Sequence, residues 1–476
     1  MNLKFKVQNF PSLNAIINML KVHETYEVRR INKLKSYYQE GMDTNAMITD
    51  DDLKRNMLPS QKPKQIVDSE ISYFLGKPIS YDASIEDGSQ ELKDILQNMF
   101  DRYHEHTINT KVAVESSITG VGYELIYIDE CSDGELNGNY TIKSTSLPAE
   151  DVFLIYSADI DEKIIAAVQI VKFHNYETNA EEKTLLLYDD MAIYEYRMED
   201  YELIPVSEYL HYFDGVPITP YYNNDYTKGT FERVLKHIDA LNYVWSCLLN
   251  EVSLYNDNTM VYELPEGSKI IKEIAETNNS KIEALIGDNK DVSESPEVQA
   301  ANNVLNQLND LFSNMRDKGT VIVENGANLR YITKGAINNE FIITTLKDEI
   351  VEYSGVPNLS KDIAGNNASG YAIQTRLQSL ENIVSIKEQF FKYGLDRRLN
   401  LMTGAINYFN IKDYNYLGVV YTFKRNLPVN NAEIIAYAKT LKESGMLSHE
   451  SILSKTGLSD DPTYELLKLE EELNRV

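Results

Sequence analysis

The sequence predicts an α+β protein that is mainly helical, and three observations predict this class. Apolar residues recur every three or four positions over long stretches, above all at 229–256 and 371–403, as they do in amphipathic helices. Between residues 123 and 206 the pattern changes to short runs rich in Ile, Val, Leu and Tyr, which is typical of antiparallel sheet. The 476 residues are 43% hydrophobic and 25% charged, which is enough to form about two to four domains with buried cores.

The first half of the chain combines helices with this sheet. Helices are expected at 12–38, where Ser12 can cap the first turn, at 64–75 and at 90–118, with the polar stretch 38–63 as a loop. After a Gly-x-Gly turn, strands are expected at 123–129, 140–146, 152–156, 164–173, 183–188, 192–197 and 202–206. Residues 60–225 therefore read as one α+β domain.

Long helices dominate the second half. Helices at 229–256 and 338–355 bracket a mixed αβ segment, which is followed by a Gly/Asn-rich loop at 357–370 and the long helix 371–403. In this long helix Gly394 marks a bend or a close contact. The Asn325-Gly326 pair predicts a hairpin that joins two strands at 320–324 and 329–333. The remaining elements are expected as strands at 260–264 and 418–424 and helices at 268–286, 297–317, 431–444, 448–456 and 463–475.

Charge and cysteine content narrow the class of function. A net charge of −27 argues against a protein that grips nucleic acid by neutralising phosphates, but it suits one past which nucleic acid slides. Basic residues outnumber acidic ones at 1–40 and 371–403, whereas acidic residues outnumber basic ones at 338–355. Each of these charged segments is expected to be either a solvated face or a surface that one subunit presents to another. Cys131 and Cys247 form no disulfide framework and are expected to be buried. With neither a membrane-length apolar run nor a signal-peptide core, we expect a soluble intracellular protein.

Signatures of catalysis are weak throughout the chain. There is no phosphate-binding G-x-x-x-x-G-K-[ST] loop and no G-x-S-x-G nucleophile elbow. His104 and His106 lie two positions apart, on different faces of a helix, and the acidic run 50–52 is more often solvated than metal-binding. The sequence therefore favours a structural protein that is not an enzyme and needs no cofactor. An acidic carbohydrate-active hydrolase with paired carboxylates stays open as the alternative, since 73 acidic residues guarantee random pairs.

The order of elements points to a known architecture. The helices 229–256 and 338–355, with the excursion between them, would make a stalk that carries a knob, with the loop 357–370 at its other end. Local motifs accompany this order: ISYFLGKPI at 71–79, GVGYE at 120–124, PAEDVFLI at 148–155 followed by Asp159, GVPI at 215–218 with NN at 223–224, IDALN at 238–242, SGVPNLS at 354–360, NASG at 367–370, Leu377 and LE at 380–381. Together they resemble the portal, or head-to-tail connector, proteins of tailed double-stranded-DNA bacteriophages of the siphophage type.

The resemblance implies a portal-like architecture and the function of these proteins. A homo-oligomeric ring, typically of twelve subunits, would form the channel at a capsid vertex through which DNA is packaged and ejected and to which the tail attaches. The implied parts are an N-terminal helical segment (1–59), an α+β wing (60–228), a first stem helix (229–256), a small αβ clip (257–337), a second stem helix (338–356), a tunnel loop (357–370), a tunnel helix with a wing strand (371–428) and helical crown segments (429–476). Another virion or connector structural protein is a further alternative.

The same resemblance implies which residues meet the DNA and which proteins meet the ring. The tunnel loop would present Asn358, Ser360, Lys361, Asp362, Asn366, Asn367 and Ser369, the stem Glu340, Lys347 and Glu349, and the tunnel helix Arg376, Gln378 and Glu381. The implied partners are other copies of the chain, double-stranded DNA, the terminase motor, the major capsid and scaffolding proteins and a neck or adaptor protein, with no membrane. The protein would reside in the virion after assembly in the cytoplasm of a host bacterium. The resemblance implies no resident metal and leaves open a divalent cation between subunits.

Overall fold

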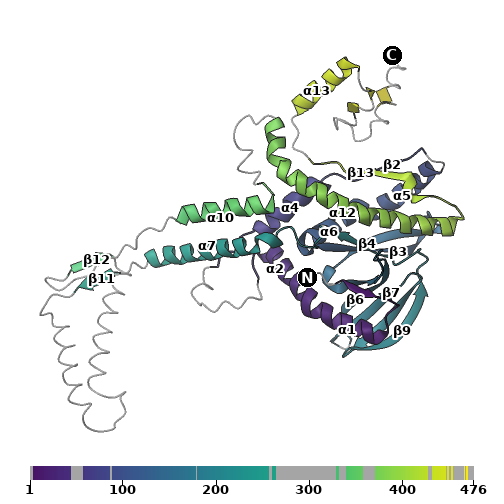
Figure 1. Ribbon diagram of the computed structural model, residues 1–476, viewed down its shortest axis with the longest axis horizontal. Helices are drawn as coiled ribbons and strands as arrows, with labels where there is room; N and C mark the ends of the chain where they lie inside the picture. Colours follow the sequence, from purple (N-terminus) through teal and green to yellow (C-terminus); the bar gives the residue numbers. More distant parts are fainter. Residues whose placement is uncertain are drawn as a thin grey trace, which may run out of the picture. The chain divides into compact units, whose positions relative to one another are not determined.

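The computed structural model divides the chain into two compact units. One unit comprises Met1–Met47, Pro59–Leu241 and Thr345–Val476, and the other comprises Ile48–Leu58 and Asn242–Thr344. The structure describes residues 4–43, 57–85, 88–177, 179–256, 260–263, 328–331, 339–357, 370–426, 431–445, 448–449, 452–453, 466 and 468–469. Helices and several sheets alternate along the chain, which confirms the predicted α+β class (Figure 1).

The predicted N-terminal helix is present and carries a wider turn in its middle. Helix α1 (Leu13–His23) runs through a π-helical segment (Glu24–Val28) into α2 (Arg29–Glu40). The Ser12 hydroxyl accepts a hydrogen bond from the Ala15 backbone amide, so the predicted cap is confirmed. Ile16 and Leu20 are fully buried against the sheet, which explains the apolar spacing seen in the sequence.

Two helices replace the single helix expected at 90–118. Helix α4 (Lys62–Leu75) agrees with the prediction, but α5 (Ser89–Tyr103) and α6 (Glu105–Thr119) are separated at His104, whose φ of 58° lies in the left-handed region. Glu105, immediately after the break, is buried and accepts a hydrogen bond from the Tyr81 hydroxyl at 2.7 Å. The buried positions of α6 include the polar residues Asn109, Ser116 and Ser117, so apolar spacing could not locate the break.

A six-stranded sheet forms the centre of the larger unit, in the order β1-β5-β6-β7-β8-β9. The β1–β5 pair is parallel and the other four pairs are antiparallel, which confirms the predicted antiparallel sheet. Its strands are β1 (Phe5–Val7), β5 (Val152–Ser157), β6 (Ile164–Asn175), β7 (Ala180–Tyr188), β8 (Ala192–Glu199) and β9 (Glu202–Leu210). The pattern did not reveal β1, because three residues are too few for a detectable alternation.

Both faces of this sheet are covered at β5, β6 and β7, whereas β9 is largely exposed. On one face α1 packs through Ile16 and Leu20 onto a cluster that includes Phe153, Val168 and Leu185. A second cluster joins Val152, Leu154 and Tyr188 of the same sheet to Ile218 of a three-stranded sheet. That second sheet has the order β10-β3-β4, from β3 (Val121–Gly134), β4 (Gly138–Leu147) and β10 (Ile218–Tyr222).

The long helix exceeds its predicted length. Helix α12 spans Gly370–Asn410, beyond the expected end at 403, and packs against β10. A Cβ on Gly394 would lie 2.5 Å from the Tyr221 ring, so the close contact expected there is confirmed. After α12, β13 (Val419–Thr422) pairs with β2 (Ser80–Ala83), and α13 (Asn431–Ser444) agrees with the expected helix.

The helices expected to form a stalk are present. Helix α7 (Leu235–Asn256) follows a 3-10 turn (Glu232–Val234), and α10 (Asn339–Ser354) agrees with the predicted 338–355. The boundary between the two units falls inside α7 and inside α10.

Of the hairpin expected through Asn325-Gly326, the structure describes only part of the second strand. This strand, β12 (Asn328–Tyr331), pairs with β11 (Met260–Glu263) in antiparallel register. The partner expected for β12, at 320–324, lies outside the described residues, as do the helices expected at 268–286 and 297–317 and most of those at 448–456 and 463–475.

The expectation of two buried cysteines is wrong. Cys131 and Cys247 are both half-buried free thiols. The Cys131 Sγ accepts a hydrogen bond at 3.2 Å from Arg102, so a polar contact replaces the apolar one that its neighbours suggested. Among the described residues, no cluster of His, Cys, Asp or Glu has the arrangement of a metal site, and no helix is long and apolar enough to cross a bilayer. The acidic run 50–52 lies outside them.

Candidate functional site

The region to which the sequence assigned function runs from α10 through the loop 357–370 into α12. The predicted loop residues Asn358, Ser360, Lys361, Asp362, Asn366, Asn367 and Ser369 lie outside the described residues, as does the side chain of Arg376. On α10, Glu340 is exposed whereas Lys347 and Glu349 are half-buried. On α12, Gln378 is exposed and donates a hydrogen bond to Asn382 at 3.1 Å. The structure therefore places the two helical ends of the loop.

The end of α10 is attached to α12 by a short polar contact. Gly355 closes α10 with its amide on the Val351 carbonyl at 2.9 Å, in a left-handed conformation with φ of 67°. Its own carbonyl accepts a hydrogen bond from the Ser379 hydroxyl at 2.9 Å. This hydrogen bond holds residues 355 and 379, which lie on either side of the loop, together. The glycine of the SGVP sequence at 354–357 is needed for the turn that ends α10.

We expect Gly355→Ala to destabilise the protein more than Gly138→Ala does. Both glycines have positive φ, at 67° and 70°, so either substitution carries a backbone cost of about 1–2 kcal/mol. At Gly355 the new Cβ would also lie 2.2 Å from Ile383 Cδ1, whereas nothing lies within 4 Å at Gly138. Urea unfolding of the two variants measures the difference. Equal losses of unfolding free energy in the two variants would show that Ile383 of α12 moves aside at no cost in stability.

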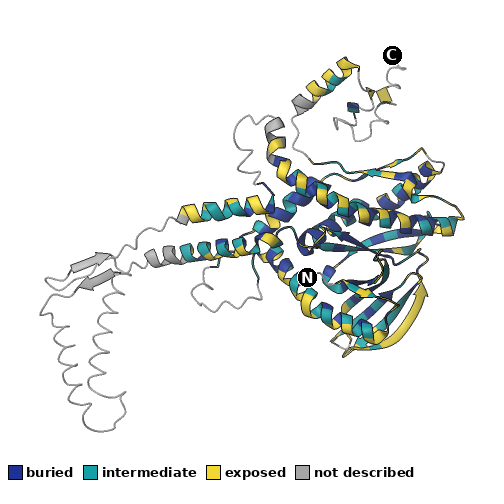
Figure 2. Ribbon diagram, in the orientation of Figure 1, coloured by how far each residue is buried: buried dark blue, intermediate teal, exposed yellow. Residues whose placement is uncertain are grey.

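Helices α7 and α10 lie side by side next to this turn (Figure 2). The His237 ring on α7 is 3.7 Å from a Glu349 carboxylate oxygen on α10, and its centroid is 5.3 Å from that of Tyr353. Asp239, also on α7, accepts a 2.6 Å hydrogen bond from the Tyr37 hydroxyl. These contacts connect the predicted stem residue Glu349 to the body of the larger unit, while Tyr353 keeps 54% of its surface exposed.

Helix α12 is anchored in the larger unit by a buried ion pair. Lys387 and Glu70 of α4 approach to 3.3 Å, and each side chain is 1% exposed. Glu70 also accepts hydrogen bonds from the hydroxyls of Ser117 at 3.1 Å and Thr230 at 2.7 Å. Burial lowers the pKa of Lys387, and the charge of Glu70 acts against this shift.

A second anchor lies eleven residues further along α12, which is three turns and so the same face of the helix. The Arg398 side chain is fully buried and contacts Glu105 at 2.6 Å and Glu124 at 2.9 Å. The Tyr221 hydroxyl donates to Glu124 at 2.6 Å. Burial alone would lower the pKa of Arg398, but the carboxylates of Glu124 and Glu105 hold it well above its usual value.

A third contact binds the first half of α12 to the segment after β13. The Arg425 guanidinium contacts Glu381 at 3.0 Å and Glu388 at 2.7 Å, and the Tyr73 hydroxyl donates to Glu381 at 2.7 Å. Partial burial would raise the pKa of Glu381, but the hydrogen bonds from Arg425, Tyr73 and Ser385 lower it below its ordinary value. The carboxylate of Glu381, predicted to face the channel, is therefore engaged within the chain.

Sequence reasoning missed the anchoring residues Lys387, Arg398, Glu70, Glu105 and Glu124. One signal could have found two of them, since Lys387 and Arg398 stand within the apolar stripe of α12 at a spacing of three turns. Charges are rarely buried unless they are paired, so such positions predict buried ion pairs. Their partners are far away in the sequence and could not have been named.

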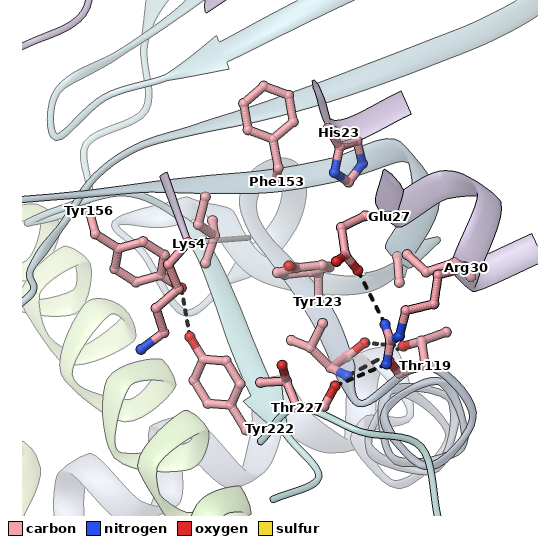
Figure 3. A pocket seen from close by; sticks show the side chains of 14 residues that line it. Lys4, His23, Glu27, Arg30, Thr119, Tyr123, Phe153, Tyr156, Tyr222 and Thr227 are labelled. Atoms are coloured by element: carbon pink, nitrogen blue, oxygen red, sulfur yellow. Dashed lines mark hydrogen bonds and ion pairs between the residues drawn. The ribbon is translucent and has the colours of Figure 1, made fainter. Parts of the chain in front are cut away.

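A small cavity lies between α1, α2 and the two sheets, and its polar walls are largely satisfied (Figure 3). Its volume is about 60 Å³, which is room for a few water molecules. The Arg30 guanidinium on one side contacts Glu27 at 3.2 Å and the Thr119 carbonyl at 2.9 Å. On the other side the Tyr156 and Tyr222 hydroxyls lie 2.6 Å apart. The cavity is a structural feature of the sheet packing.

Comparison with known proteins assigns the chain to a family. Residues 17–476 match the family described as phage portal protein, SPP1 Gp6-like. The chain is 20% identical to the portal protein of Bacillus phage SPP1 over 93% of this chain and 80% of that protein. It is 22% identical to the portal protein of Clostridium phage phiCD119 over 86% of this chain and 83% of that protein. The chain therefore belongs to the SPP1 Gp6-like family of phage portal proteins, structural and non-catalytic virion proteins that serve DNA packaging and ejection.

Proposed function

We propose that copies of this chain, typically twelve, close into a ring whose channel is lined by the loop 357–370 and by the adjoining parts of α10 and α12. The observation that carries this proposal is the hydrogen bond from the Ser379 hydroxyl to the Gly355 carbonyl, at 2.9 Å. It joins the end of α10 to α12, the two helices between which the loop lies in the sequence, and buried ion pairs anchor α12. The family assignment replaces the hydrolase and the other virion proteins considered above, because family members are non-catalytic portal proteins.

In this proposal the channel holds DNA weakly. A subunit with a net charge of −27 repels phosphate and avoids the counterion release that makes basic proteins bind DNA. Lys361 in the loop and Lys347 on the stem would order the duplex locally, between the acids Glu340, Glu349 and Asp362. The polar side chains Asn358, Ser360, Asn366, Asn367 and Ser369 and the helix residues Arg376 and Gln378 complete the proposed lining.

The remaining segments take the other roles of the proposed portal. Exposed aromatic residues on the stem helices, Tyr243 at 59% and Tyr353 at 54%, would pack against neighbouring copies. The clip (257–337) would meet the terminase motor and then a neck or adaptor protein. The wing (60–228) would meet the major capsid and scaffolding proteins. The ring would occupy a capsid vertex after assembly in the host cytoplasm.

Two measurements test the proposal. Native mass spectrometry and electron microscopy of the purified full chain should show a closed ring with an axial opening wide enough for duplex DNA. A photo-crosslinking residue at Lys361 should then bind DNA in packaged heads, whereas the same residue at Tyr176, 89% exposed in the turn between β6 and β7, should not. A stable monomer, or equal crosslinking at both positions, would contradict the proposed channel.

A further inference from the structure

Among the described residues, Arg397 of α12 lacks the acidic partner that the neighbouring cations of this helix have. Lys387 pairs with Glu70 at 3.3 Å, Lys392 with Glu388 at 2.8 Å and Arg398 with Glu105 at 2.6 Å. Among the residues that the structure describes, no carboxylate lies within the 4.0 Å of an ion pair from Arg397. Its Nη2 donates to the Val216 carbonyl at 2.8 Å, and its Nε is buried without a hydrogen-bond partner.

The surroundings of Arg397 are aromatic and polar. Tyr393 lies one turn earlier on α12, with its ring centroid 6.4 Å from that of Tyr222. The Tyr222 hydroxyl in turn meets that of Tyr156 at 2.6 Å, as Figure 3 shows for this pair. Burial lowers the pKa of Arg397, and the nearby tyrosines Tyr393, Tyr156 and Tyr222 act against this shift. A largely buried guanidinium whose Nε has no hydrogen-bond partner, and to which the described residues supply no counter-ion, is unfavourable.

The acidic side chain that interacts with Tyr222 cannot supply the anion that Arg397 lacks. Glu162 acts on the same Tyr222, but Lys4 binds its carboxylate at 3.0 Å and Lys6 binds the other oxygen. The hydrogen bonds from Lys6 and Lys4 lower the pKa of Glu162 to about 2. This carboxylate is therefore already engaged by two cations. The described residues of the subunit therefore offer no further anion to Arg397.

The site is open to such a partner. Arg397 is only half-buried as a residue, and Tyr393 beside it is 52% exposed. We propose that Arg397 receives a carboxylate side chain from a second copy of this chain, which completes an ion pair across the subunit contact of the ring. The proposal rests on the ring proposed above, and it adds the residue at which two copies meet.

The position of Arg397 on α12 favours a second copy over DNA as the source of the anion. The chain carries 73 acidic and 46 basic residues, so a neighbouring copy offers carboxylates readily. Arg397 is separated by seven to eight turns of α12, about 40 Å, from the helix start at Gly370, where the proposed channel loop ends. A phosphate of DNA in the channel is therefore distant from this site. A paired guanidinium here would also offset part of the repulsion between acidic subunits.

The test compares Arg397→Met with Lys392→Met in the full chain. Both changes remove one positive charge from α12, but Lys392 has its acid within the same subunit. We expect Arg397→Met to raise the concentration at half assembly, measured by mass photometry in phosphate-free buffer, about tenfold or more. Lys392→Met should change it by less than about twofold, as expected for a surface pair. Arg397→Lys, which keeps the charge without the forked donor, should lie between them.

Two further measurements distinguish a failure of the inference about Arg397 from a failure of the proposed ring. Thermal unfolding of the dissociated Arg397→Met subunit should match or exceed that of the wild type, since the variant loses an unpaired cation. An electron-microscopy map of the ring should place a neighbour's carboxylate within hydrogen-bond distance of Arg397. If the wild type forms rings and the two Met variants have the same assembly curve, the inference about Arg397 is overturned but the proposed function stands. If the wild type forms no rings, the proposed function is overturned. Stabilisation of the wild-type subunit, but not of Arg397→Met, by inorganic phosphate would identify a free-anion site and also overturn the inference.

Discussion

Replacement of Arg398 by Met is expected to lower the stability of the larger unit by about 3–5 kcal/mol or to prevent its folding. The substitution leaves Glu105 and Glu124 buried without their cation, because the Arg398 side chain is 0% exposed and contacts both carboxylates. Methionine replaces the length of the side chain, so most of the effect comes from the unpaired charges. Urea unfolding followed by circular dichroism measures the loss, and soluble yield records a failure to fold.

Two controls separate this effect from the general loss of a charge. Lys392→Met removes a cation from the same helix whose side chain is 43% exposed, and a loss below about 1 kcal/mol is expected. The triple variant Arg398→Met, Glu105→Gln, Glu124→Gln removes all three charges and should recover part of the stability. If Arg398→Met unfolded at the same urea concentration as Lys392→Met, the buried anchor would have no role in stability.

A double-mutant cycle on Glu70 and Lys387 is expected to show strong coupling. Lys387→Met leaves the Glu70 carboxylate buried with hydroxyl partners only, and Glu70→Gln leaves the ammonium of Lys387 without its counter-ion. Each single change should cost about 3–5 kcal/mol, because both side chains are 1% exposed. The double variant should be much closer to the wild type than the sum of the single losses, since replacing a whole buried pair is often nearly neutral.

The measurement is the free energy of unfolding of the four proteins under one condition. The exposed pair Lys439–Glu443 on α13, at 4.0 Å, provides the matched cycle for a surface contact. Its coupling should not exceed about 0.5 kcal/mol. Additive losses at Glu70 and Lys387 would mean that the two side chains act independently and that α12 is held by its apolar face alone.

These two anchors bear on function through the position of the loop 357–370. Ser379 attaches α12 to the end of α10, and Lys387 and Arg398 attach the same helix to α4, α6 and β3. In the proposed channel, a helix held at three places along its length would move together with the elements that hold it. In the proposed channel, force from passing DNA would therefore be transmitted from the loop to the whole wing.

Periodicity and composition predicted most helices and strands from the sequence. The apolar steps of α1, α7 and α12 and the short β-rich runs of β3 to β9 depend on which residues a single element must bury. The turn at 354–357 could also be predicted from the sequence, because the preference for glycine at the end of a helix depends only on the local backbone. The assignment to portal proteins came from the order of such local motifs, and the family match confirmed it.

Only the tertiary structure decided which residues meet across the chain. Arg398 and Glu105 are 293 positions apart, and no local pattern relates them. The same holds for the parallel β1–β5 pair, for the pairing of β12 with β11, and for the helix break at His104 that brings Glu105 into the core. A sequence pattern records what one element needs to bury. Which residue pairs with a buried charge depends on how separate elements pack. The free-energy cost of leaving that charge unpaired arises only when packing removes it from water.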